Sequence, residues 1–307
     1  MRNAFAEEVT RLAAENSKLV LLSGDIGNKL FDNFKKVDEK RFFNCGVAEA
    51  NMMGVAAGMA LSGLRPVIYT ITPFTTTRCF EQIRVDACYH KAPVIIVGTG
   101  SGLSYAELGP THHSLEDMAI LRTLPGMRVL APCDATELRL GLRAALNQDG
   151  PVYIRIGKKG EPAIHKQPPE FQIGRGIVVR SGTEVALVVS GTVMPEALKA
   201  ADLLQADGVS AEVTSFHSVK PLDEAYLEDA SRRFKLLATI EEHGRIGGLS
   251  GAVAEWGASR RDMPRQIAFG TADEFMHEVG SQEYAREKYG LTAASIAARV
   301  LAALNEA

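Results

Sequence analysis

Short apolar segments rich in β-branched residues recur along the chain, each bounded by Gly or Pro and separated from the next by a helical pattern. Strands that alternate with helices in this way form parallel sheets covered on both faces. Two such series occur, so we predict an α/β fold with two domains, each a mostly parallel sheet flanked by helices. The predicted strands are residues 19–26, 42–45, 67–71, 94–97, 129–131, 152–156, 185–189, 211–216, 236–240 and 266–269.

The division into two domains agrees with the length of 307 residues, about twice that of a common domain. Pro-containing pairs and weak apolar periodicity indicate an exposed linker at residues 161–173, between domains of residues 1–160 and 174–307. Residues 46–62 carry many small side chains and are predicted to form a buried helix. Other helices are predicted to begin near Met194, Asp223, Gly247 and Thr292, the last with a side-chain N-cap.

Composition and charge narrow the class of ligand. The formal net charge is only -3 and no Lys/Arg-rich run occurs, so neither a nucleic acid nor an anionic membrane is expected as a partner. No signal peptide or membrane-spanning apolar run is present, and the four cysteines lack paired spacing. We therefore expect a cytoplasmic protein with reduced thiols and a small-molecule ligand.

One carboxylate, Glu49, stands in an apolar setting that includes Val47, Met52 and Met53. Burial disfavours the charged form of such a group unless a partner compensates, so we expect an acid that can give its proton to a ring nitrogen. The residues alone leave a second interpretation open, in which Glu49 is a solvated charge favoured by the dipole at the start of a helix.

The segment around Glu49, NCGVAEANMMGVAAGMALSGLRPVI at residues 44–68, resembles a known motif. It is similar to the pyrimidine-binding motif of transketolases, 1-deoxyxylulose-5-phosphate synthases and the β subunits of 2-oxo acid dehydrogenases. The resemblance implies that Glu49 is catalytic and contacts the aminopyrimidine of thiamine diphosphate. A hydrogen bond from this acid favours the imino tautomer, which removes the thiazolium proton.

A second stretch, ELGPTHHSLEDMAILRTLPGMRVLAPCDATEL at residues 107–138, resembles the same family. There the histidine of GPTH faces the substrate, which implies that His112 is catalytic, hydrogen-bonding a substrate oxygen and shuttling a proton. The alternative is a histidine that caps a helix or packs in the core. His113 is placed near the substrate without a firm family role, and no metal ligands are predicted in this chain.

Between these motifs, PFTTTRCFEQIRVDA at residues 73–87 resembles the segment that supplies aromatic faces beside the cofactor. The resemblance implies Phe74 as the stacking residue, Phe80 as a second candidate and Arg78 near the substrate mouth. Phe80 also has helical core spacing, so simple packing is the alternative for it. The spacing around Phe74 is one residue longer than in the synthases.

Other positions depart from the family pattern. Gly100 stands where transketolases have a histidine that helps to hold the sugar phosphate, and Leu108 replaces the aspartate that precedes GPTH. These departures argue against a standard phosphoketose substrate. Arg155 and Lys158 are anion contacts by resemblance, or alternatively the basic edge of the linker. The Gly-rich run at residues 98–102 lacks the following helix of a dinucleotide loop.

The second domain resembles the C-terminal domain of the same enzymes, so the resemblance covers almost the whole chain. Its Glu241–His243 segment is expected to be structural first. The Gly-Asp-Gly motif and asparagine that hold Mg²⁺ and the diphosphate in the family are absent, and Gly24–Gly27 is interpreted as a turn.

The resemblance therefore implies the C-terminal subunit of a split transketolase. Such an enzyme transfers a two-carbon ketol unit, with thiamine diphosphate and Mg²⁺ held jointly with an N-terminal subunit, and we expect two copies of each polypeptide (α2β2). Two alternatives remain open. One is the β subunit of a 2-oxo acid or acetoin dehydrogenase, and the other is a non-catalytic regulatory or scaffold subunit.

Overall fold

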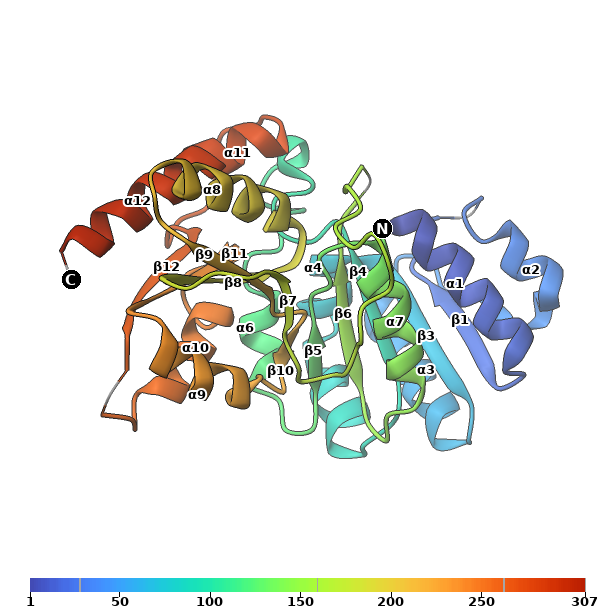
Figure 1. Cartoon of the computed structure of the whole chain (residues 1–307). Coiled ribbons are helices and arrows are strands. Elements are labelled where there is room, and N and C mark those ends of the chain that lie inside the picture. Colours follow the sequence, from blue (N-terminus) through green and yellow to red (C-terminus); the bar gives the residue numbers. More distant parts are fainter. Residues whose placement is uncertain (28, 159, 262, 307) are drawn as a thin grey trace.

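The computed structural model describes residues 1–27, 29–158, 160–261 and 263–306, and contains two sheets with helices on both faces (Figure 1). The larger sheet has seven strands in the order β10-β5-β6-β4-β3-β1-β2, and the smaller has five in the order β12-β11-β8-β9-β7. Within them, only the pairs β10–β5 and β7–β9 are antiparallel. The predicted α/β fold with two mostly parallel sheets is confirmed.

The strands of the larger sheet are β1 (Leu19–Ser23), β2 (Phe42–Asn44), β3 (Arg65–Ile71), β4 (Ile95–Thr99), β5 (Arg128–Leu130), β6 (Val152–Ile156) and β10 (Ser218–Lys220). Those of the smaller sheet are β7 (Ile177–Arg180), β8 (Val185–Ser190), β9 (Ala211–Ser215), β11 (Leu236–Gly244) and β12 (Arg265–Thr271). The first-domain helices are α1 (Arg2–Glu15), α2 (Asp32–Asp38), α3 (Glu49–Leu61), α4 (Thr72–Thr76), α5 (Phe80–Gln82), a π-helical segment (Ile83–Tyr89), α6 (Asp117–Arg122) and α7 (Ala135–Leu146). The second-domain helices are α8 (Met194–Ala206), α9 (Glu224–Arg233), α10 (Leu249–Gly257), α11 (Gln282–Lys288) and α12 (Ala293–Asn305).

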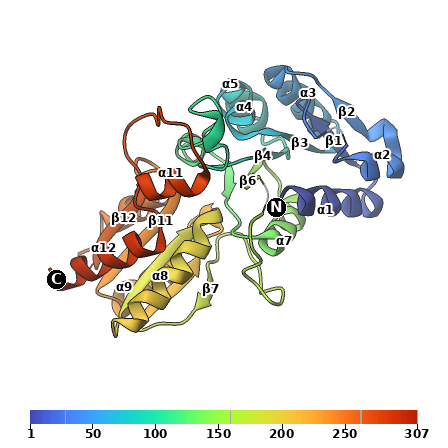
Figure 2. The ribbon, with the colours of Figure 1, turned by 90° about the horizontal axis from the view of Figure 1, so that it is seen from above.

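Both faces of the larger sheet are buried, as its near-continuous apolar strands require. Successive residues of β1 point to opposite faces: Leu19 and Leu21 join the core under α1 and α7, whereas Val20 and Leu22 join the core under α3. On the first face the Phe5 ring stacks on Tyr69, with ring centroids 5.1 Å apart. Figure 2 shows α1 and α7 side by side over this face.

The second domain repeats this layering on a smaller scale. Its cores lie under α8 and α12 on one face and under α9 and α10 on the other, with α8 and α12 side by side (Figure 2). The predicted N-cap is confirmed, because the Thr292 side chain accepts a hydrogen bond from the amide of Ser295. Asp223 caps α9 in the same way. None of the described helices combines the length and apolar character that crossing a bilayer requires.

Two strands, β7 and β10, were not expected from the sequence. Both are short, antiparallel and at a sheet edge, and so lack the long apolar run of a central parallel strand. Strand β10 comes from the C-terminal half of the chain, yet Ser218 pairs with Leu130 of β5. The larger sheet is therefore completed by a segment that follows the linker.

The segment 161–173, predicted to be an exposed linker, has no helix or strand but is anchored to the first domain. The amides of Ile164 and His165 donate to Asp134, at 2.9 and 3.0 Å. The His165 ring lies 2.8 Å from a carboxylate oxygen of the fully buried Glu137. Potential ligand atoms of Cys133, Glu137 and His165 all lie within 4.8 Å of one another, although here Glu137 and His165 pair directly.

We expect replacement of His165 by Ala to destabilise the chain by about 1–3 kcal/mol, because it removes the ring that pairs with one oxygen of the buried Glu137 carboxylate and leaves only the hydrogen bonds from the Cys133 amide and the Ser215 hydroxyl to the other. The hydrogen bond with Glu137 raises the pKa of His165. A histidine with a raised folded-state pKa stabilises fully below its unfolded pKa of about 6.5, and this contribution is lost as the pH rises through the folded value. Thermal unfolding at pH 6 and pH 8.5 should therefore show the larger loss at pH 6. An equal loss at both values would contradict this charge pairing.

Candidate active site

Three loops that carry the sequence motifs meet at one edge of the larger sheet. Residues 45–48 follow β2, α4 follows β3, and residues 100–114 follow β4. These strands run parallel, so their carboxyl ends lie at the same edge, which is where ligands bind in open α/β sheets. The topology thus explains how motifs distant in the sequence come together.

Glu49 is the first residue of α3 and is only 4% exposed. Met52, Met53 and Ala56 on the same helix are fully buried, so the helix packs tightly where its first turn holds the carboxylate. This burial excludes the solvated charge that the sequence left open. Burial also raises the pKa of the nearby Cys79 thiol to about 12, and the Glu49 charge adds to the effect, so that cysteine is not an activated nucleophile.

The Glu49 carboxylate has a compensating partner that the sequence did not reveal. Arg78 Nη1 donates to Glu49 Oε1 at 3.1 Å. The same guanidinium lies over the Phe74 ring, with Cζ 3.7 Å from the ring centroid. Arg78 is nevertheless 45% exposed, so water reaches it from the outer side. Glu49 and Phe74 thus both contact the Arg78 guanidinium, which is flat and donates hydrogen bonds through its nitrogen atoms.

His112 also packs against Phe74. The two ring centroids are 5.3 Å apart in an edge-to-face arrangement, and the Tyr105 ring is 6.1 Å from His112. The loop that carries His112 is closed at its neck by the bridge between Gly102 and Ser114. Glu49, Arg78, Phe74 and His112 therefore form a continuous series of contacts.

Tyr105 was not predicted as a site residue. The glycine at position 100 is the sequence feature that is linked to it. Gly100 has a φ of +74°, and a Cβ added there would lie 1.9 Å from the Tyr105 ring. The space beside Gly100 is therefore filled by an aromatic ring from the same loop, and the positive φ also favours glycine at this position.

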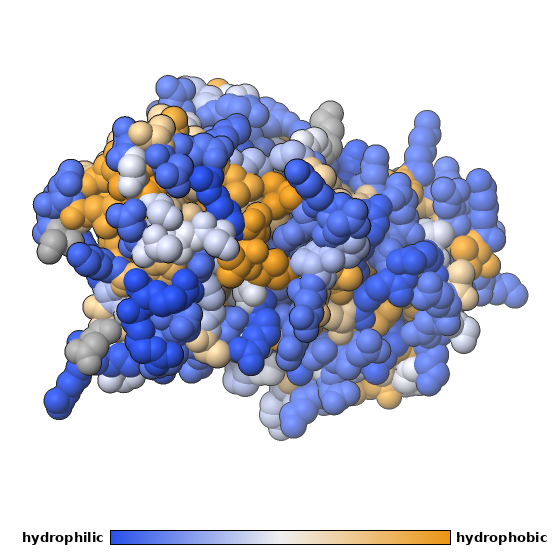
Figure 3. All heavy atoms as spheres, in the orientation of Figure 1, coloured by the Kyte–Doolittle hydropathy of each residue, from blue (hydrophilic) through white to orange (hydrophobic). Residues whose placement is uncertain are grey.

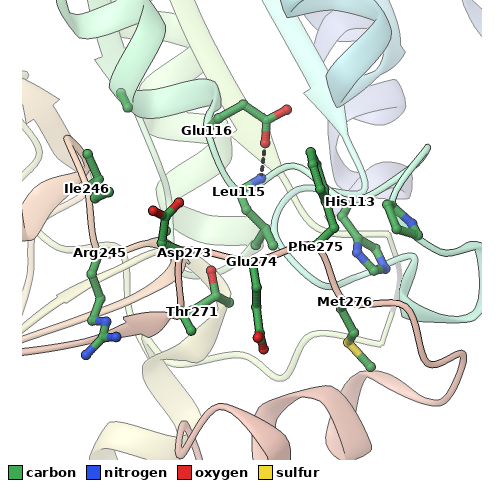
Figure 4. A pocket seen from close by; sticks show the side chains of 14 residues that line it. His113, Leu115, Glu116, Arg245, Ile246, Thr271, Asp273, Glu274, Phe275 and Met276 are labelled. Carbon is green, nitrogen blue, oxygen red and sulfur yellow. Dashed lines mark hydrogen bonds between the residues drawn. The ribbon is translucent and has the colours of Figure 1, made fainter.

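His113 faces a different space from its neighbour. It is buried and lines a pocket of about 870 Å³ between the domains, together with Ile246, Phe275 and Met276 (Figure 4). Burial lowers the pKa of His113, which favours the neutral imidazole. Figure 3 shows hydrophobic residues gathered near the middle of one face, where the two domains meet.

Two other predicted residues have mainly structural surroundings. Phe80 is half-buried and packs against the core that contains the fully buried Ile83 and Ala87, as its helical spacing allowed. His243 is fully buried and its Nε2 accepts from the amide of Ala119, 3.3 Å away, which agrees with a structural role.

The structure places Arg155 in the interior and not at a substrate mouth. It is 3% exposed, forms a 2.9 Å ion pair with Asp117 and donates to the carbonyl of Ser114 at 3.0 Å. These contacts lie within the first domain, and Arg155 also donates to the carbonyl of Glu242 in the second domain at 3.3 Å, so structural contacts stand here in place of the anion contact expected from the resemblance. Lys158 is more open; it pairs with Glu107 and lies 4.6 Å from the Tyr105 ring centroid, beside the loop of His112.

Comparisons with known proteins cover nearly the whole chain. Residues 1–161 match the family model described as transketolase, pyrimidine binding domain, and residues 174–296 match the model described as transketolase, C-terminal domain. A "putative transketolase C-terminal section" from Methanocaldococcus jannaschii is 35% identical over 98% of this chain and 95% of its own length. The "6-deoxy-6-sulfo-D-fructose transketolase subunit" of Clostridium sp. is 35% identical, over 96% of this chain and 92% of its own length.

A longer relative and a solved structure also match nearly the whole chain. The 1-deoxy-D-xylulose-5-phosphate synthase of Thermomicrobium roseum is 36% identical over 99% of this chain, but the match covers only 48% of that enzyme. A solved structure titled "split gene transketolase, inactive beta4 tetramer" superposes with a TM-score of 0.91 at 38% identity, covering 99% of this chain and 98% of that one.

Proposed function

Because the chain belongs to the transketolase family, through a pyrimidine-binding domain and a C-terminal domain, we propose that it is the C-terminal subunit of a split, thiamine-diphosphate-dependent transketolase. The relatives that it matches over more than 90% of their length are named as sections or subunits, which supports the split arrangement. The observation that carries the proposal is the placement of the buried Glu49 and the Phe74 ring around one flat group, with His112 adjacent.

These residues fit an aminopyrimidine. The guanidinium of Arg78 is planar, donates to Glu49 and stacks on Phe74, which are the same contacts that a flat amino-substituted ring makes. Glu49 and Phe74 would therefore hold the pyrimidine, with the partly exposed Arg78 turned toward the entrance. When bound, thiamine diphosphate supplies the carbanion that attacks a ketose carbonyl.

The roles of this chain's residues follow from their surroundings. Glu49 holds a proton at the pyrimidine ring nitrogen, and its burial keeps water from competing for that hydrogen bond. His112 donates a hydrogen bond to a substrate oxygen and carries its proton. Lys158, close to the same loop, provides a positive charge for an anionic substrate group. Mg²⁺ and the diphosphate would be held by the N-terminal subunit.

The surface near Glu49 supports a shared site. Apolar side chains stand exposed on β2, on α3 and on the turn between them: Phe43 (38%), Val47 (71%), Val55 (39%) and Leu61 (58%). Such a cluster is typical of a surface that a subunit covers. We propose that α3 lies at an intersubunit cleft and that the complex contains two copies of each polypeptide.

Reconstitution tests the proposal. We expect the purified chain alone to show no ketol transfer, and activity to appear when it is mixed with a polypeptide carrying the diphosphate motif, thiamine diphosphate and Mg²⁺. A coupled assay of ketol transfer, run beside an assay of lipoamide-dependent oxidation, distinguishes the transketolase from the dehydrogenase alternative. Full turnover by the chain alone, or lipoamide-dependent oxidation without ketol transfer, would show that the proposal is wrong.

A further inference from the structure

A buried carboxylate of the C-terminal domain forms a hydrogen bond with the backbone of the first domain. Glu242, on β11, is 2% exposed, and its Oε2 accepts a hydrogen bond from the backbone amide of Leu103 at 3.1 Å. Leu103 stands at the start of the loop that carries His112. A charged acceptor for a buried amide is a strong and directional contact.

The carboxylate of Glu242 is itself held firmly. Gln282 Nε2 donates to both of its oxygens at 3.0 Å, and Arg286 Nε forms an ion pair with it. Both donors belong to α11, and Arg286 also donates to the carbonyl of Thr192 at 3.1 Å. The charge is therefore paired within its own domain, which offsets the free energy of burying it.

Glu242 also touches the neck of the loop directly. Gly102 has a φ of +63°, and a Cβ added there would lie 2.7 Å from the Glu242 Cβ, so only glycine fits. The carbonyl of Glu242 accepts from Arg155 Nη2 at 3.3 Å, and the same nitrogen donates to the carbonyl of Ser114. Glu242 thus contacts the Leu103 end of the loop through its side chain and is linked to the Ser114 end through Arg155.

We propose that Glu242 is a positioning residue, which fixes the neck of the loop at residues 102–114 and so holds His112 against Phe74. The part that concerns turnover rests on the function proposed above for His112; the part that concerns loop order does not. The C-terminal domain would then control the geometry of a site that lies on the other domain.

Hydrogen exchange of the full-length chain tests the first part. In Glu242→Gln the shape is kept but the charge that pairs with Arg286 is lost, and we expect the amides of residues 102–114 to exchange at least about tenfold faster. The matched control is Glu212→Gln, a carboxylate of the same domain that is 5% exposed and pairs with Arg233 at 3.0 Å. The control should leave residues 102–114 unchanged.

Unchanged exchange of this loop in Glu242→Gln would overturn the proposal. Should that variant fail to fold, Gln282→Ala removes one donor to the carboxylate, and the same acceleration, smaller in size, is expected.

Steady-state kinetics of the reconstituted complex tests the second part. We expect kcat to fall by about 10- to 100-fold in Glu242→Gln, with KM for the ketose donor within about twofold, because a misplaced His112 affects the transition state more than binding. Faster loop exchange with an unchanged kcat would overturn the positioning role. Absence of ketol transfer in the wild-type complex would count against the proposed function alone, since the exchange experiment requires no partner.

Discussion

Replacing Glu49 by Gln should lower ketol transfer by the reconstituted complex by about 10²- to 10⁴-fold, the usual range for a general acid or base. The amide keeps the shape of the side chain and its place beside Arg78 and Phe74, but it cannot exchange a proton with a pyrimidine nitrogen. Turnover should be measured together with the size of the complex by gel filtration, because the loss is expected with assembly intact.

The control for this variant is Glu8→Gln. Glu8 is a carboxylate of the same domain, 2% exposed and paired with Arg143, but it belongs to α1 on the opposite face of the sheet. The Glu8→Gln complex should keep its activity within about twofold of the wild-type value, because Glu8 is remote from the candidate active site. Unchanged activity in Glu49→Gln would remove Glu49 from catalysis and favour a regulatory or scaffold subunit.

Replacing His112 by Ala should lower kcat by about 10²-fold or more, through loss of the group that binds and protonates a substrate oxygen. The His112 ring contacts the rings of Phe74 and Tyr105. The substitution removes the imidazole alone and leaves these two aromatic side chains in the site. The pH profile of kcat should change as well, since the site then lacks the proposed proton carrier.

His90→Ala is the matched control, because His90 is exposed and its ring contacts only the carbonyl of Val85 and the ring of Tyr89 in the described structure. That variant should keep both the rate and the pH profile of the wild-type complex. An identical pH profile with and without His112 would exclude it as the proton carrier.

Much of the site could be predicted from the sequence, because the residues concerned stand in local motifs at the ends of parallel strands. Glu49, Phe74 and His112 follow three different strands, and the sheet brings their loops to one edge. Ten predicted strands correspond to strands of the structure for the same reason: apolar runs bounded by turns are a local signal.

What could not be predicted depends on contacts between distant segments. Arg155 looks like an anion contact until Asp117 and Ser114 are seen to enclose it. The pairing of Arg78 with Glu49 likewise arises from the meeting of two loops. The edge strands β7 and β10 are too short to show a period, and only tertiary pairing defines them.

The position of β10 has a consequence for how the chain can be divided. This strand leaves the C-terminal half, closes the edge of the larger sheet beside β5, and lies next to a contact between Ala131 and the carbonyl of His217, 2.7 Å away. A fragment ending in the segment 161–173 would expose the backbone of β5 and invite edge-to-edge aggregation. Cutting the polypeptide there would therefore leave the N-terminal part with an incomplete sheet.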